Sequence, residues 1–87
     1  MSLTVELTYD MAKLLGTPRF EVEGARTVQE VLVAARARFQ DQGEAFDRMA
    51  RSAAVALNGV LVSHRRGPAT RVEDGDRVGF VKVASGG

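Results

Sequence analysis

The chain closes on the stretch Asp74-Gly75-Asp76-Arg77-Val78-Gly79-Phe80-Val81-Lys82-Val83-Ala84-Ser85-Gly86-Gly87. Its first residues combine aspartate with glycine, which is typical of a tight turn. From Val78 to Val83 the residues alternate between two faces, with the two-residue period of a strand. The last four residues carry no large side chain that would dock on a core. The stretch therefore predicts a turn, a final strand and a flexible tail over residues 84–87.

Two further strands are predicted just before this stretch. Residues 54–57 and 60–62 are short apolar runs, and they flank Asn58-Gly59. Asn-Gly is the strongest two-residue signal for a type I′ hairpin, because both turn positions need a positive φ. Residues 64–70 contain glycine and proline and are predicted to form a loop. The hairpin therefore supplies the third and fourth strands.

One long helix is predicted to begin at Thr27. Thr27-Val28-Gln29-Glu30 has the spacing of a capping box, in which the threonine hydroxyl accepts a backbone hydrogen bond and the glutamate reaches back. The apolar residues of this helix recur at steps of three and four, which places them on one face. They are Val28, Val31, Leu32, Ala35 and Phe39. Residues 44–51 are predicted to form a short second helix.

The N-terminal segment predicts two more strands. Residues 3–9 alternate between apolar and polar side chains, ending on Tyr9, and residues 19–22 alternate again after Gly16-Thr17-Pro18. These two strands are expected to pair as a hairpin. The order of elements predicts an α+β fold, with a mixed sheet of about five strands, one main helix packed across one face and a short second helix. A single domain is expected over residues 1–83.

Composition excludes several classes of function. Twelve basic and eleven acidic residues give a net charge of +1, and tryptophan is absent, so no nucleic-acid partner is expected. No apolar run approaches the ~20 residues that span a bilayer, which predicts a cytoplasmic protein without membrane contact. Cysteine is absent and His64 is the single histidine, so no metal site is expected. No glycine-rich nucleotide motif is present, and we expect no bound cofactor and no enzyme activity.

The element order, the Asn-Gly hairpin and the C-terminal stretch resemble the ubiquitin-like β-grasp sulfur carriers, MoaD-like and ThiS-like, and specifically the small subunit of molybdopterin synthase. Residues 74–87 align without a gap to the MoaD-like pattern Asp-Gly-Asp-x-Val-Ala-Phe-Phe-Pro-Pro-Val-x-Gly-Gly. Residues 11–17 are similar to the aromatic-Ala-x-Leu segment of that family, which ends in Gly-Thr. Thiamine-pathway carriers usually lack an equivalent of residues 44–51, so the resemblance favours the MoaD-like type.

The resemblance implies a role for the diglycine. Gly87 is expected to be adenylated by an E1-like enzyme of the MoeB or ThiF type, which holds ATP and Mg²⁺, and then converted to a thiocarboxylate. The sulfur is expected to serve molybdopterin (molybdenum cofactor) biosynthesis through a large subunit of the MoaE type. Gly86 is expected to thread a narrow channel, because it has no Cβ. Met11, Leu61 and Val81 fall at positions that face partners in the family, although apolar residues there are equally compatible with a place in the core.

Two departures from the family pattern leave other acceptors open. Lys82-Val83 stand where the family usually has Pro-Pro, and Val81 stands where it often has a second phenylalanine. These changes leave the tail less stiff and the contact area smaller. The alternatives are a carrier for tRNA thiolation, cysteine or thiamine biosynthesis, a ubiquitin-like protein modifier, and a non-covalent adaptor with an incidental tail.

Overall fold

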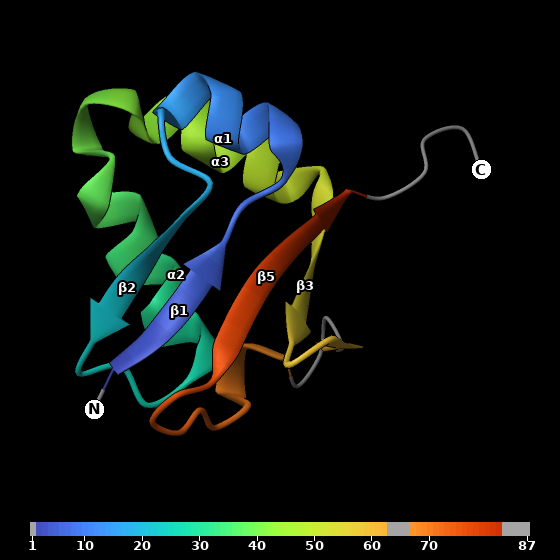
Figure 1. Cartoon of the computed structure of the whole chain (residues 1–87). Helices are drawn as coiled ribbons and strands as arrows, with labels where there is room; N and C mark the ends of the chain where they lie inside the picture. Colours follow the sequence, from blue (N-terminus) through green and yellow to red (C-terminus); the bar gives the residue numbers. More distant parts are fainter. Residues whose placement is uncertain (1, 63–66, 83–87) are drawn as a thin grey trace.

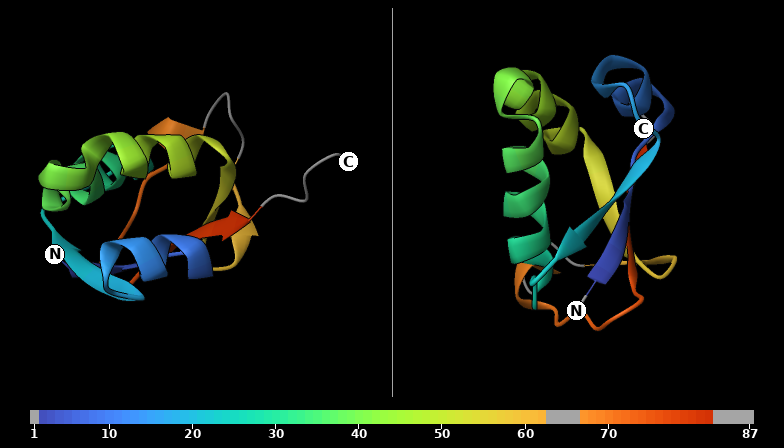
Figure 2. Two further views of the ribbon diagram at one scale, coloured as in Figure 1. Left: turned by 90° about the horizontal axis from the view of Figure 1, so that it is seen from above. Right: turned by 60° about the vertical axis from the view of Figure 1, so that its left-hand side comes forward.

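The computed structural model describes residues 2–62 and 67–82. Figure 1 shows one sheet with α2 crossing behind it, and Figure 2 shows α2 and α3 on the same side of that sheet. The predicted α+β class, the mixed five-stranded sheet and the main helix across one face are confirmed. In chain order the elements are β1 (Ser2–Glu6), α1 (Tyr9–Leu15), β2 (Arg19–Glu23), α2 (Val28–Arg38), η1 (Gln40–Gln42), α3 (Gly43–Arg51), β3 (Ala53–Leu57), β4 (Val60–Leu61), η2 (Gly67–Ala69) and β5 (Arg77–Lys82).

The sheet places the first and last described strands side by side at its centre. Its strand order is β2-β1-β5-β3-β4. β1 pairs with β5 in parallel and with β2 antiparallel, while β3 pairs antiparallel with both β5 and β4. Asn58 and Gly59 have φ angles of 51° and 85°, which confirms the predicted hairpin turn. Because β1 and β5 are parallel, β5 ends at the same edge of the sheet at which α1 begins.

The N-terminus of α2 is capped by its own first turn. Thr27 Oγ1 accepts a hydrogen bond from the backbone N–H of Glu30 at 3.2 Å. Glu30 Oε1 accepts one at 2.9 Å from the backbone N–H of Arg26, the residue before the N-cap. The first bond satisfies an N–H group that a helix start otherwise leaves unpaired, and the second ties the residue before the N-cap to the first turn. The helix therefore begins where the sequence predicts.

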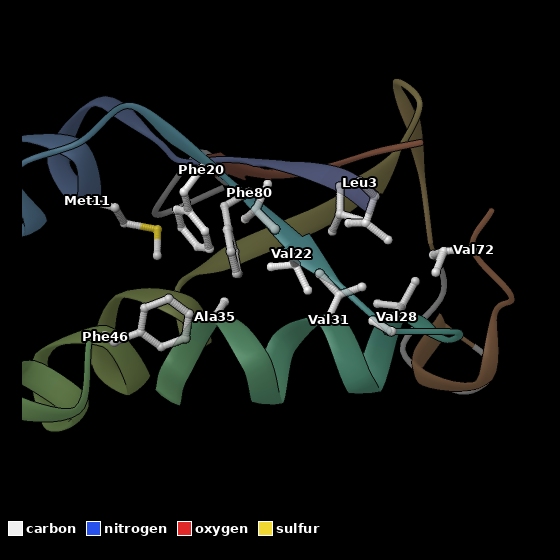
Figure 3. Packing of buried hydrophobic residues seen from close by; sticks show 13 residues of the cluster. Leu3, Met11, Phe20, Val22, Val28, Val31, Ala35, Phe46, Val72 and Phe80 are labelled. Carbon is white, nitrogen blue, oxygen red and sulfur yellow. The ribbon is translucent and has the colours of Figure 1, made fainter. Parts of the chain in front are cut away.

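The core fills the space between α2 and the inner face of the sheet (Figure 3). A chain of aromatic contacts crosses it, with ring centroids 5.3 Å apart for Phe20 and Phe39, 6.1 Å for Phe39 and Phe46, and 5.7 Å for Phe46 and Phe80. Offset and edge-to-face pairs of this kind add to the stabilisation from burial. Because Phe46 lies in α3 and Phe80 in β5, the contacts hold the predicted short helix against the sheet.

The segment after β1 is a helix, which corrects the prediction that the first strand runs to Tyr9. β1 ends at Glu6, and α1 begins at Tyr9 with Thr8 as its N-cap, because Thr8 Oγ1 accepts a hydrogen bond from the backbone N–H of Met11 at 3.1 Å. Gly16 ends the helix in the left-handed region, with φ 83°. A cap at each end therefore overrides the alternation that suggested a longer strand.

Candidate functional site

The face of the sheet opposite α2 carries an apolar surface. Side chains alternate across a strand, so the buried residues of β5 alternate with Gly79 and Val81, which point outward. Ala54 and Ala56 of β3 lie opposite Val81 and Gly79, and Leu61 of β4 lies opposite Ala56. Three adjacent strands therefore contribute one face, which we call the outer apolar face: Ala54, Ala56, Leu61, Gly79 and Val81. Ala56 is itself buried, at 6% exposure, so the neighbouring residues supply the open surface.

Two larger side chains of the outer apolar face are open to solvent. Leu61 is 63% exposed and Val81 is 43% exposed. A groove of about 430 Å³ includes Val81 in its lining, together with Gly79 and the charged residues Glu6 and Arg77. A Cβ built on Gly79 would come no closer than 3.8 Å to Glu6 Oε1, so the glycine leaves the groove open without being sterically required. An exposed apolar surface beside a groove is typical of a protein-docking site.

The structure separates the three residues that the sequence proposes as partner contacts. Leu61 and Val81 are exposed on the outer apolar face, as such a contact requires. Met11 is only 1% exposed and points into the core (Figure 3), so its assignment to a partner surface is wrong and its core alternative holds. Met11 is the buried residue of α1, and it belongs to the core cluster that also contains Phe46 and Phe80. Gly86 and Gly87 lie outside the described residues.

The turn before β5 is held by a small hydrogen-bond network. Asp76 Oδ2 accepts a hydrogen bond from the backbone N–H of Glu73 at 2.7 Å, and Asp76 Oδ1 accepts one from Asn58 Nδ2 at 3.0 Å. Asn58 Oδ1 in turn accepts one from the backbone N–H of Arg77 at 2.9 Å. Asp76 is therefore a turn former, as the sequence predicts, and it also joins the turn to the β3–β4 hairpin.

This network makes part of the folding stability depend on pH. The hydrogen bond from Asn58, followed by that from the Glu73 N–H, lowers the pKa of Asp76 below its ordinary value of 3.8. A lowered pKa contributes stability that is complete above the unfolded-state value and is lost as the pH falls through the folded value. We expect Asp76→Asn to lose less stability than the wild type between about pH 5 and about pH 2, measured by thermal unfolding. An unchanged pH slope in the variant would contradict this assignment.

The end of β5 is tied to the start of α1. Lys82 Nζ lies 3.5 Å from Asp10 Oδ2, and both side chains are largely exposed. Tyr9, the residue before Asp10, is 78% exposed. The sequence interpretation missed Tyr9 as a surface residue because it placed it on the buried side of a strand. Thr8 as a cap and Gly16 as a helix end were the signals that would have placed it on a helix.

The described residues include no group of three histidine, cysteine, aspartate or glutamate side chains that could hold a metal ion. His64 lies outside the described residues. Within the two described ranges, no helix has the length and apolar character needed to cross a membrane.

Comparison with protein families gives one match that spans most of the chain. The model of the ThiS family matches residues 10–87. No curated protein matches the sequence. The thiamine biosynthesis protein ThiS from Geobacter metallireducens is 30% identical, with a TM-score of 0.59 and full coverage of both chains.

Two other solved structures share the fold at lower identity. SAMP1, a small archaeal modifier protein from Haloferax volcanii, has a TM-score of 0.74 at 20% identity, with both chains fully covered. The molybdopterin-converting factor from Helicobacter pylori, solved as a complex of its subunits 1 and 2, gives a TM-score of 0.64 at 22% identity, again with both chains fully covered. These similarities extend over the whole length of the β-grasp fold.

Proposed function

The chain belongs to the ThiS family and is a ubiquitin-like sulfur carrier or modifier of the ThiS and MoaD kind, and we propose that Gly87 is the group it presents. An E1-like enzyme would activate the Gly87 carboxylate with ATP, and a sulfide equivalent would then convert it to a thiocarboxylate. The observation that carries the proposal is the outer apolar face, whose residue Val81 lies at the end of β5, five residues before Gly86 in the sequence. Catalysis belongs to the partner enzymes.

The chemistry explains why a partner must first activate the tail. A carboxylate oxygen of Gly87 attacks the α-phosphorus of ATP, and pyrophosphate leaves, which gives an acyl-adenylate. Sulfide, released from a persulfide by a thiol reductant, then attacks the carbonyl carbon and AMP leaves. The carrier supplies the end group and the docking surface, while the partner supplies the nucleotide site and Mg²⁺.

Molybdopterin synthesis is the acceptor pathway that we propose, with this chain as the small subunit of molybdopterin synthase. Two points support it: the sequence resemblance of residues 44–51, which lie in α3 (Gly43–Arg51), to the extra segment of the MoaD-like carriers, and the similarity of the fold to the molybdopterin-converting factor over the full length of both chains. Thiamine biosynthesis is the second candidate, supported by 30% identity to a ThiS protein. Protein modification is the third, supported by the similarity to SAMP1.

The decisive experiment is intact-mass spectrometry of the full chain after incubation with E1-like enzymes of the MoeB and ThiF types, ATP, Mg²⁺ and a persulfide donor. We expect a mass gain equal to the replacement of one oxygen by sulfur, and no gain when ATP is omitted. Failure to gain this mass with any activating enzyme would refute the carrier function. The sulfur acceptor then separates the three candidates. Transfer to a molybdopterin synthase large subunit supports molybdopterin synthesis, and transfer to a thiazole synthase supports thiamine biosynthesis. Transfer to neither, with lysine-linked adducts formed instead, supports protein modification.

A further inference from the structure

Tyr9 is the most exposed of the large apolar side chains in the described ranges, at 78%. It is the first residue of α1, outside the core. Single exposed apolar side chains are common on protein surfaces, so exposure alone does not mark a binding site. The place of Tyr9 in the fold is what distinguishes it from the others.

The register of the central strands places Tyr9 at the end of β5. Glu6 lies opposite Gly79 in the parallel β1–β5 pair, and Tyr9 and Lys82 each follow three residues later. The ion pair between Asp10 and Lys82, at 3.5 Å, joins the first turn of α1 to the last residue of β5. Seen from above in Figure 2, α1 lies beside the end of β5. Tyr9, the residue before Asp10, and Val81, the residue before Lys82, therefore both lie close to this ion pair in the chain.

The small number of residues after Lys82 limits how far the activating enzyme can lie from the end of β5. The following step rests on the proposed function, in which Gly87 is the reacting residue. Five residues, 83–87, follow Lys82, and a fully extended chain of that length spans at most about 18 Å. An enzyme that reacts with Gly87 must bring its active site within that distance of Lys82. Its surface therefore lies close to the end of β5, where the first turn of α1 is also found.

We propose that Tyr9 is an anchor residue for the activating enzyme, with its ring held in an apolar pocket next to the contact made by Val81. Tyrosine is enriched among the few side chains that dominate binding energy, whereas valine offers less contact area. The neighbouring charges allow this contact, because Asp10 and Lys82 are paired with each other. Covering a paired carboxylate and ammonium costs less desolvation energy than covering either charge alone.

The test measures the initial rate of sulfur loading at Gly87 by the activating enzyme as a function of carrier concentration. Four full-length proteins are compared: wild type, Tyr9→Ala, Tyr9→Phe and Val33→Ala. Val33 is the matched control, because it is 58% exposed but lies on α2, away from the end of β5. We expect Tyr9→Ala to raise the KM for the carrier about tenfold with kcat unchanged. Tyr9→Phe keeps the ring and should stay within about threefold, and Val33→Ala within about twofold, of the wild type.

Several outcomes would overturn the role of Tyr9. A wild-type KM in Tyr9→Ala, or a fall in kcat at unchanged KM, contradicts an anchor at the docking surface. If Tyr9→Ala unfolds, Tyr9→Gln replaces it, because glutamine removes the ring and has a favourable helix propensity, and a wild-type KM in that variant is equally contradictory. Absence of loading in the wild type refutes the proposed function itself, whereas loading of every variant with equal KM refutes only the role of Tyr9.

Discussion

Gly86→Ala is expected to lower the rate of sulfur loading at Gly87 by at least about a hundredfold, because catalytic rates fall by about that factor when a reacting group is misplaced by about 1 Å. Under the proposed function, the last residues enter a narrow channel of the activating enzyme. Glycine passes such a channel because it has no Cβ and adopts backbone angles that alanine resists. Loading is measured by intact mass, and the adenylation step by release of pyrophosphate.

The matched control is Ser85→Ala, which changes a side chain one position earlier and leaves both glycines intact. It is expected to load at close to the wild-type rate. Gly86→Ala should also keep the wild-type melting temperature, because the substitution lies beyond β5, the last described element. Loading of Gly86→Ala at the wild-type rate would show that the tail does not pass through a confined channel.

Leu61→Asp is expected to raise the KM for the activating enzyme on the order of a hundredfold, because a carboxylate would be buried without a partner within an apolar contact. Leu61 lies on the outer apolar face opposite Ala56 and is 63% exposed. Since the side chain is already open to solvent, the folded state of the free carrier should tolerate the change. The KM is measured from the initial rate of loading at a series of carrier concentrations.

Val60→Asp provides a control from the same strand. Val60 is 70% exposed and lies opposite Leu57, so its side chain points to the other side of the sheet. The same charge placed there should leave the KM within about threefold of the wild type, because the residue lies outside the docking surface. Equal effects of the two substitutions would indicate a general loss of folding or solubility and would contradict docking through the outer apolar face.

Local features of the sequence predicted most elements correctly. Asn58-Gly59 forms the predicted hairpin because positive φ is a property of those two residues. α2 begins directly after its N-cap Thr27 because the cap involves residues within one turn of it. The seven-residue α1 was missed because so short a helix depends on its caps and on packing more than on periodicity.

The sequence by itself determined the order of the strands and of α2 and α3, the turn chemistry and the small-residue tail, because each depends on residues that are neighbours in the chain. Only the tertiary structure decided which apolar residues meet solvent. It buried Met11, exposed Leu61 and Val81, and brought Tyr9 to the end of β5. The physical reason is that burial depends on the parallel pairing of β1 with β5 and on the packing of α1, contacts between segments far apart in sequence.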